Sequence, residues 1–218
     1  MFSRGGWTMA FALVMWWMNR VEYPAVSARI LIVLGLIAVA FLAAGAIMVW
    51  SSRVAKLSLR DRLLDSLALQ GSEKILDVGS ARGLLAIGAA KRLKSGKVTG
   101  LDVSNSADAT KENAKLEGVA DKVRIETGDA RKLVYPEGNF DVVVSSLAIH
   151  NLPDKEDREQ SVREMFRVLK PGGRLLIYDT FKTAEYAETL RALNAQDVEL
   201  SGTSYLWCVP SRSVTAKK

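Results

Sequence analysis

The chain has 218 residues, of which 49% are apolar, and a formal net charge of +6. This length holds one α/β domain of ordinary size and an N-terminal appendage, but hardly two full domains. Cys208 is the only cysteine and the chain has one histidine, which excludes an intrachain disulfide and leads us to expect no metal site. Basic residues are mixed with acidic ones and form no cluster interleaved with aromatics, so we expect no nucleic-acid partner.

The first 52 residues are almost free of charge. Ile30 to Trp50 carries none, and as a helix this stretch would be about 31 Å long, close to the roughly 30 Å hydrocarbon core of a bilayer. A buried core helix is disfavoured because a helix that is apolar on every face needs protein all round it. We therefore predict a membrane anchor over 1–52 with a transmembrane helix at 30–50.

The earlier apolar stretch, residues 7–18, is short, and two interpretations remain open. It can lie in the membrane interface as an amphipathic helix, or it can form a first span that makes a hairpin with the second. Basic residues follow the predicted span, a pattern typical of its cytoplasmic end: Arg53, Lys56, Arg60 and Arg62. We expect an integral membrane protein in contact with lipid, with its soluble part on the cytoplasmic side.

A connecting helix is predicted over 53–70, because its leucines recur at helical spacing. It leaves no long flexible tether before the folded domain, 71–218. There, short β-branched runs alternate with amphipathic stretches, a pattern that predicts an α/β fold with a doubly wound, Rossmann-like sheet. The predicted strands are 74–79, 97–103, 122–128, 140–147, 174–180, 197–201 and 212–216. The predicted helices are 83–94, 106–117, 156–169 and 183–194.

The segment Asp77-Val-Gly-Ser-Ala-Arg-Gly83 follows the first of these strands and opens the next helix. It places small residues where the backbone must turn sharply and approach a ligand at a helix N-terminus. The dinucleotide spacing G-x-G-x-x-G would need glycines at 81 and 84, which are Ala81 and Leu84. The loop therefore favours a nucleoside ligand that has no pyrophosphate.

Two aspartates end the next two strands. Asp102 is placed where a carboxylate accepts hydrogen bonds from both ribose hydroxyls, although it can equally cap the following helix, as can Ser104 or Ser106. Asp129, in Glu126-Thr-Gly-Asp-Ala130, can accept from an adenine amino group or serve as an ordinary turn residue.

Together these residues resemble the class I S-adenosylmethionine-dependent methyltransferases, in particular small-molecule methylases of the ubiquinone/menaquinone C-methylase type. The resemblance covers roughly 70–218 and also includes Asn139-Phe-Asp-Val-Val-Val-Ser-Ser146. Its most specific part is Glu164-Met-Phe-Arg-Val-Leu-Lys-Pro-Gly-Gly-Arg174, a helix ended by Pro-Gly-Gly before a strand.

The resemblance implies a seven-stranded sheet whose last strand is antiparallel, and an enzyme that converts S-adenosylmethionine to S-adenosylhomocysteine. It places Asp77, Gly79 and Gly83 around the methionine part of the cofactor, Asp102 at the ribose, Asp129 and the backbone of Ala130 at the adenine, and Ser145 and Ser146 along the sulfonium. Their neighbours Ser80, Ala81 and Val103 are also implied as cofactor-binding residues. The family usually has glycine where this chain has Ala81.

His150 lies just beyond the fourth predicted strand, and an imidazole suits proton removal near neutral pH. It is a candidate for orienting or deprotonating the methyl acceptor, and an ordinary loop histidine is the alternative. In the family's topology the last hairpin turns at the cofactor-binding edge, so Tyr205 and Trp207 can wall the acceptor site, touch lipid or pack on their own sheet.

The membrane anchor and this family together suggest an apolar or amphiphilic acceptor: a quinone precursor, a lipid amine, a thiol or a phenol. Two alternatives stay open. One is a membrane-tethered protein methyltransferase. The other is an inactive, cofactor-binding scaffold subunit, which the substitution at Ala81 keeps in view.

Overall fold

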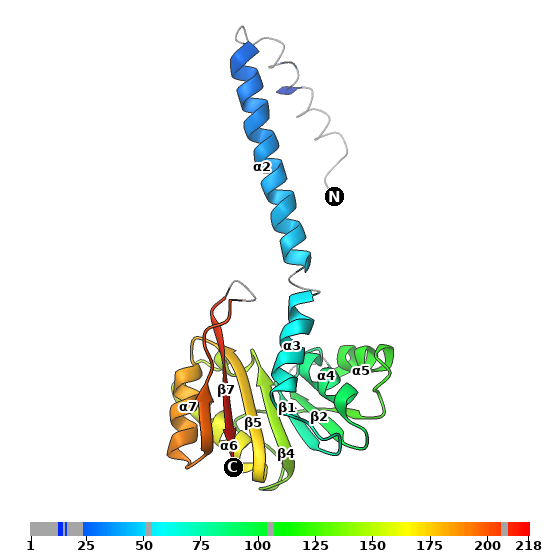
Figure 1. The fold of residues 1–218 in the computed structure, drawn as a ribbon, viewed down its shortest axis with the longest axis vertical. Coiled ribbons are helices and arrows are strands. Elements are labelled where there is room, and N and C mark those ends of the chain that lie inside the picture. The colour runs from blue at the N-terminus through cyan, green and yellow to red at the C-terminus, as the bar shows by residue number, and fades with distance from the viewer. Residues whose placement is uncertain (1–12, 15, 17–23, 51–53, 104–106, 206–208) are drawn as a thin grey trace. The chain divides into compact units, whose positions relative to one another are not determined.

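The computed structural model describes residues 13–14, 16, 24–50, 54–103, 107–205 and 209–218 (Figure 1). The chain divides into two compact units, Met1–Ser52 and Arg53–Lys218. Elements keep the labels of Figure 1.

The first unit contains the long helix α2, Pro24–Trp50, which begins six residues before the predicted start. Within it, Ala28–Trp50 is long and apolar enough to cross a membrane. Its large side chains are widely exposed, as Phe41 (75%) and Met48 (76%) illustrate. Of the predicted helix at 7–18, only Leu13, Val14 and Trp16 are described, and all three are helical; the rest of that stretch lies outside the described residues.

The second unit is built on one seven-stranded sheet in the order β3-β2-β1-β4-β5-β7-β6. β7 runs antiparallel to both of its neighbours, and every other neighbouring pair is parallel. This topology confirms the predicted fold, including the antiparallel last strand. The strands are β1 Lys74–Val78, β2 Lys97–Asp102, β3 Val123–Thr127, β4 Phe140–Ser146, β5 Leu169–Thr180, β6 Gln196–Leu200 and β7 Ser211–Lys217.

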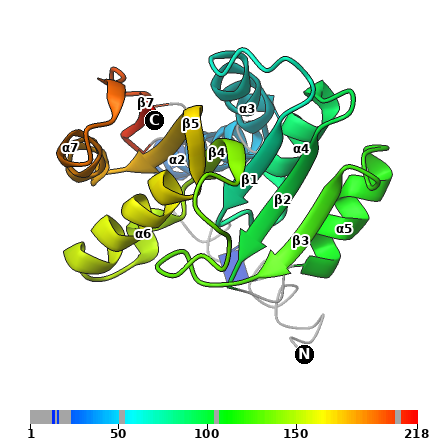
Figure 2. The same ribbon diagram turned by 90° about the horizontal axis from the view of Figure 1, so that it is seen from below.

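Helices cover both faces of the sheet (Figure 2). On one face the apolar sides of α3, α4 and α5 pack on β1, β2 and β4, and on the other α6 and α7 pack on β4, β5 and β7. This is the layered arrangement expected when each amphipathic helix buries one stripe against a sheet. Their bounds are α3 Lys56–Asp65, α4 Leu84–Arg92, α5 Ala107–Leu116, α6 Lys155–Arg167 and α7 Thr183–Ala192.

One predicted boundary is wrong by five residues, and the helix end just before it by two. The helix before Pro-Gly-Gly ends at Arg167, and β5 begins at Leu169, five residues earlier than predicted. Leu169 is fully buried and pairs with Phe140, so strand pairing with β4 starts before Pro171. A register shift between Phe140 and Val142 then accommodates the extra residues on β5.

The carboxyl ends of the parallel strands meet at one edge of the sheet, which we call the carboxyl edge. It is formed by the residues that follow these strands: Gly79, Val103, Gly128, Leu147 and Phe181. The connection between β6 and β7 returns to the same edge, because Ser211 at the start of β7 pairs with Thr180 at the end of β5. In open α/β sheets, ligands bind at this edge.

Candidate cofactor and acceptor site

The loop after β1 packs closely against neighbouring elements because two of its positions have no side chain. Gly79 has φ of 74°, and a Cβ added there would lie 2.2 Å from the Cβ of Ala148. Gly83 has φ of 82°, and its added Cβ would lie 2.5 Å from Cγ2 of Thr110. Only glycine adopts this left-handed backbone without penalty, so both glycines are required by the turn and by its neighbours.

Ala81, between these glycines, is tied to two other elements. Its N–H donates to Oδ2 of Asp102 at 2.5 Å, and its carbonyl accepts from Oγ1 of Thr110 at 2.6 Å. Its φ is 45°, a left-handed value that glycine would adopt more easily. The alanine is therefore accommodated at some conformational cost, in a loop that α5 and the end of β2 hold in place.

Asp77, the last but one residue of β1, lies beneath this loop and is almost wholly buried. Its Oδ2 accepts from the backbone N–H of Ala86 at 2.9 Å, in the first turn of α4. Burial raises the pKa of Asp77 to about 7; the Ala86 hydrogen bond opposes that rise and the charge of Asp102 adds to it. Asp77 thus supports the loop through α4.

A cavity of about 290 Å³ opens above the loop at the carboxyl edge. Six of the residues predicted to bind the cofactor line it: Gly79, Ala81, Asp102, Val103, Asp129 and Ala130. The opposite wall is apolar and comes from the segment after β4, through Leu147, Ala148, Ile149 and Leu152. A concave site with an apolar wall and a few converging polar groups suits a nucleoside ligand.

Asp129 is already engaged in this site. Arg131 binds both of its carboxylate oxygens, at 2.7 to 3.0 Å, and lowers the pKa of Asp129. Arg131 also reaches Asp157, at 2.8 Å. Any hydrogen bond from an adenine amino group to Asp129 must therefore be shared with Arg131.

The other predicted cofactor residues lie near the cavity without lining it. Ser80 and Gly83 belong to the loop, and Ser146 is partly buried at the end of β4. Ser145 is fully buried, and its Oγ donates to the carbonyl of Val78 at 2.8 Å, which ties β4 to β1. Tyr205 is 69% exposed, and Trp207 lies outside the described residues.

His150 does not line the cavity; its ring is bonded to the end of β5 instead. Its Nδ1 lies 2.5 Å from Oδ1 of Asp179, and its backbone N–H donates to Oδ2 of the same carboxylate at 3.0 Å. Asp179 is completely buried and also accepts from the hydroxyl of Tyr186 at 3.2 Å. Because a carboxylate only accepts, Nδ1 is the ring nitrogen that donates to Asp179, and Nε2 is the one left for a second partner.

Sequence reasoning missed Asp179. A signal for it exists in the sequence, because Asp179 is near the end of the fifth strand and His150 follows the fourth. If these strands are parallel neighbours, both residues lie at the same edge of the sheet. The structure supplies the partnership, since β4 and β5 pair with Ser146 opposite Tyr178. The result is a histidine held in one orientation on the carboxyl edge.

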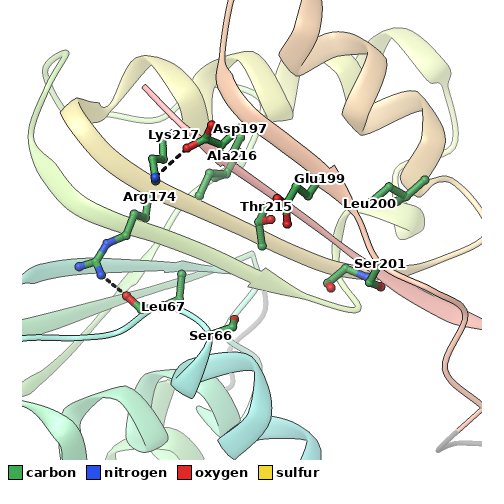
Figure 3. Close-up of a pocket in the computed structure, with 12 residues that line it drawn as sticks. Ser66, Leu67, Arg174, Asp197, Glu199, Leu200, Ser201, Thr215, Ala216 and Lys217 are labelled. Carbon is green, nitrogen blue, oxygen red and sulfur yellow. Dashed lines mark hydrogen bonds and ion pairs between the residues drawn. The ribbon is translucent and has the colours of Figure 1, made fainter.

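A larger hollow, about 430 Å³, lies on the sheet face that α6 and α7 do not cover (Figure 3). Polar side chains of β6 and β7 line it, and the exposed ion pair of Lys217 with Asp197 (2.7 Å) closes one end. None of the predicted site residues is present, and the hollow is away from the carboxyl edge. Size alone does not make it the cofactor site.

The doubly wound sheet, the glycine turn after β1 and the acidic residue ending β2 define the class I S-adenosylmethionine-dependent methyltransferase fold. Residues 75–173 match the family model described as a methyltransferase domain. This stretch of the chain, less than half of its length, is similar to the methyltransferase domain of that family.

The curated relatives agree with this assignment. The chain is 37% identical over 122 residues to a 27-O-demethylrifamycin SV methyltransferase of Amycolatopsis mediterranei, covering 56% of this chain and 43% of the relative. It is 36% identical over 111 residues to a ubiquinone/menaquinone biosynthesis C-methyltransferase of Azotobacter vinelandii, covering 50% and 43%. The chain thus spans less than half the length of these relatives.

Solved structures share the fold. A S-adenosylmethionine-dependent methyltransferase from Aquifex aeolicus superposes with a TM-score of 0.58 at 20% identity, covering 72% of this chain and 88% of the other. The [4+2]-cyclase SpnF gives a TM-score of 0.65 at 20% identity, covering 74% and 81%. Because one of these proteins is described as a cyclase, the fold alone does not assign the reaction.

Proposed function

We propose that this chain is a membrane-anchored methyltransferase that moves the methyl group of S-adenosylmethionine to a lipophilic or amphiphilic small molecule. The observation that carries the proposal is the cavity between the Gly79–Gly83 loop, Asp102 and the segment after β4. S-adenosylmethionine, when bound, supplies an electrophilic methyl group on a sulfonium. The protein then has to align the acceptor and exclude water.

Each part of the cavity matches one part of this cofactor. Gly79 lets the loop pack against Ala148 on the facing wall of the cavity, and Gly83 is the N-cap of α4. We assign Asp102 to the ribose hydroxyls, with Val103 beside them, and Ala130 with Asp129 to the adenine. Asp77 and Ser80 support the loop, and the end of β4 at Ser145 and Ser146 borders the position of the sulfonium.

We assign His150 to the acceptor. Asp179 accepts from Nδ1, so in the neutral ring Nε2 can take a proton from a hydroxyl, thiol or neutral amine acceptor as that acceptor is methylated and S-adenosylhomocysteine leaves. The buried carboxylate stabilises the resulting imidazolium. Tyr205, on the hairpin that returns to this edge, is assigned to the entrance for the acceptor.

The membrane part of the proposal is supported by sequence connectivity and by α2. The apolar helix Ala28–Trp50 precedes the second unit, Arg53–Lys218, which we call the catalytic unit. A domain that uses a cytosolic cofactor must lie on the cytoplasmic side. Basic residues after the span agree with that side. One relative is named for quinone methylation, so a quinone precursor is the first acceptor to test, followed by lipid amines, thiols and phenols.

Calorimetric titration of the full chain in detergent with S-adenosylmethionine and S-adenosylhomocysteine tests the cofactor site. Asp102→Ala should abolish binding. Asp102→Asn should weaken it, because the amide oxygen still accepts from Ala81 N–H while the charge is lost. Asp108→Ala, which removes a carboxylate that is 98% exposed, is the matched control and should bind normally. Unchanged binding in both Asp102 variants would refute the assignment.

One observation favours a second function, that of a cofactor-binding scaffold without turnover. Ala81 adopts a left-handed backbone at the position where the family usually has glycine. If the wild-type chain binds the cofactor but methylates no quinone precursor, lipid amine, thiol or phenol, while Ala81→Gly gains activity, the scaffold function replaces the enzymatic one.

A further inference from the structure

The exposed apolar side chains of the catalytic unit are concentrated at one edge. Among its described residues, eight large apolar side chains are exposed, and six of them lie at or beside the carboxyl edge. Val103 follows β2, Phe181 follows β5, and Tyr205 and Val209 lie in the β6–β7 connection. We call these four residues, together with Val54 and Leu57 before and in the first turn of α3, the apolar rim.

Val54 and Leu57 belong to this edge because of the direction of α3. The far end of α3 is at the opposite edge, where Arg174, which pairs with Val142 near the start of β4, donates to the carbonyls of Leu67 and Ala68. Along the way, Arg60 packs on Gly88 in the middle of α4, and Asp65 pairs with Arg92 at the end of α4. α3 therefore runs alongside α4 in the same direction, and both begin at the carboxyl edge.

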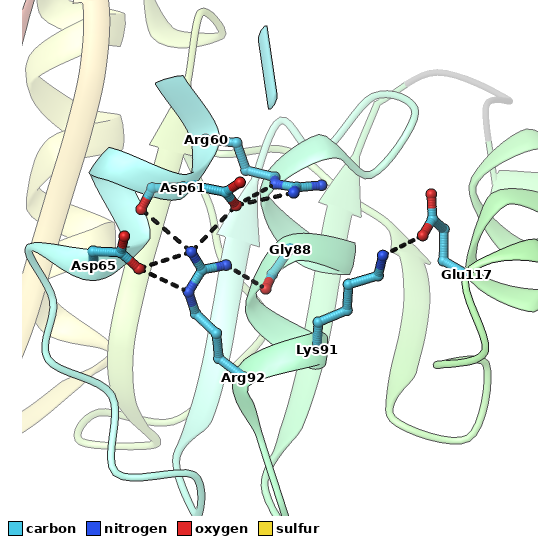
Figure 4. A network of polar contacts seen from close by, with 7 residues as sticks. All are labelled: Arg60, Asp61, Asp65, Gly88, Lys91, Arg92 and Glu117. Carbon is cyan, nitrogen blue, oxygen red and sulfur yellow. Dashed lines mark hydrogen bonds and ion pairs between the residues drawn. The ribbon is translucent and has the colours of Figure 1, made fainter. Parts of the chain in front are cut away.

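Ion pairs and apolar burial fix α3 to the rest of the unit (Figure 4). Arg92 binds Asp65 at 2.8 Å and Asp61 at 3.2 Å, and Asp61 also binds Arg60 at 2.9 Å. Leu64, on the inner side of α3, is 1% exposed. The first turn of α3 consequently moves with the sheet and its carboxyl edge.

Phe181 is held outward by a strained backbone. Its φ is 58°, which is rare for an aromatic residue, and the N–H of Lys182 donates to the carbonyl of Thr180 at 2.6 Å. This is the hydrogen bond of a three-residue turn centred on Phe181, a turn that costs free energy in its left-handed form. The side chain remains 73% exposed, so burial within the protein does not compensate for the strain.

The covalent chain indicates what covers the rim. Trp50, the last residue of the apolar span, is four residues from Val54, so their Cα atoms lie at most about 15 Å apart. The headgroup layer on each side of a bilayer is about 5–8 Å thick. The start of α3 is therefore within about 15 Å of the end of a span that a bilayer would hold.

We propose that the apolar rim inserts into the headgroup region of the same membrane, so that the carboxyl edge and its cavity face the lipid. This inference rests on the proposed membrane anchoring and extends it. An amphiphilic acceptor would then pass from the bilayer to His150 without crossing water. Six separated apolar side chains suit shallow insertion, because each gains from burial in the interface.

Fluorescence quenching by lipids tests the rim in the full chain. In a Cys208→Ser background, a polarity-sensitive fluorophore is attached to a single cysteine introduced at Phe181, at Tyr205, or at Leu116 as the control. Leu116 is 80% exposed but ends α5 at the opposite edge. Each protein is reconstituted in vesicles of phosphatidylcholine and phosphatidylglycerol, with and without lipids that carry a nitroxide near the headgroup.

We expect several-fold stronger quenching at positions 181 and 205 than at position 116. A Phe181→Asp substitution should reduce the quenching of the probe at 205, and thermal melting should show that the fold is unchanged, since Phe181 is exposed. Equal quenching at all three positions would overturn the proposal, and so would quenching at 205 that is unaffected by Phe181→Asp.

Vesicle flotation after alkaline carbonate washing separates this failure from failure of the anchor. Protein that does not float with the vesicles contradicts the proposed membrane anchoring itself. Protein that floats but shows no preferential quenching contradicts only the rim, and leaves a covering by residues 1–23 or by a second copy as the explanation for the exposed side chains.

Discussion

At the scale of single residues, the site depends on positions that tolerate no larger side chain. Gly79→Ala would place a Cβ 2.2 Å from that of Ala148 and force alanine to a φ of 74°. Overpacking costs about 1–3 kcal/mol and the left-handed backbone about 1–2 kcal/mol. We expect loss of cofactor binding in calorimetry and a clearly lower free energy of unfolding.

Two variants separate the collision from the backbone strain. Gly118→Ala has the same kind of φ, 70°, with nothing within 4 Å, so it should lose only the backbone contribution and keep cofactor binding. Adding Ala148→Gly to Gly79→Ala removes the colliding atom and should restore part of the binding. Equal stability losses in Gly79→Ala and Gly118→Ala would show that the contact with Ala148 is unimportant.

Asp77 should make stability fall as pH rises. Its pKa is about 7 in the folded chain and near 3.8 when unfolded, so between these values the folded state holds a proton that the unfolded state lacks. The contribution of Asp77 to the free energy of unfolding therefore decreases with rising pH, by up to about 1.4 kcal/mol per pH unit, and levels off above pH 7.

Denaturant unfolding between pH 5 and pH 8 measures this effect. Asp77→Asn keeps an acceptor for Ala86 N–H but cannot ionise, so its stability should be flatter across that range than that of wild type. Carboxylates whose pKa is lowered, such as Glu73 and Asp141, titrate below this window and do not mask the difference. Parallel curves for the two proteins would contradict a raised pKa at Asp77.

Asp179 is a positioning residue if His150 takes a proton from the acceptor. Asp179→Asn should leave S-adenosylmethionine binding unchanged, lower kcat, and alter the pH profile of kcat, because an amide can donate to Nδ1 and reverse the tautomer. His150→Ala should also lower kcat. Adding Asp179→Asn to His150→Ala should lower kcat no further, because Asp179 acts through His150. A uniform loss of activity at every pH, together with lower thermal stability, would indicate a structural role only.

At the scale of elements, apolar burial should outweigh ion pairing in holding α3. Leu64 is almost fully buried, and Leu64→Ala should cost about 2–5 kcal/mol. The side chain of Arg92 is 25% exposed, and its ion pairs with Asp61 and Asp65 should contribute about 1 kcal/mol or less. Leu57→Ala, at a position 45% exposed, is the control. If urea unfolding shows a larger loss of stability for Arg92→Ala than for Leu64→Ala, this interpretation is reversed.

At the scale of the whole molecule, the catalytic unit should fold without the first 52 residues, because both apolar clusters of its core begin at Leu59 or later. We expect residues 53–218 to melt cooperatively and to bind S-adenosylmethionine with the affinity of the full chain. Methylation of a vesicle-embedded acceptor should fall, while methylation of the same acceptor in detergent should persist. Aggregation or loss of cofactor binding in the truncated protein would show that the units depend on each other.

The sequence by itself determined the order and type of the elements, because strand and helix periodicities are local and α/β alternation leaves few topologies. It also predicted a glycine turn after β1 and a carboxylate ending β2, which line the same cavity in the structure, while the binding role of Asp102 stays a prediction. The boundary before Pro171 was beyond its reach, because strand pairing at Leu169 depends on Phe140, which is distant in the chain.

Only the tertiary structure decided which polar groups meet. The partnership of His150 with Asp179 requires β4 and β5 to be neighbours, and the contact of Arg131 with Asp157 requires α6 to lie beside the loop after β3. The hydrogen bond from Ser145 to the carbonyl of Val78 requires β4 to lie beside β1. Such contacts depend on positions in space, and a linear pattern of residues records them only where strand order is already known.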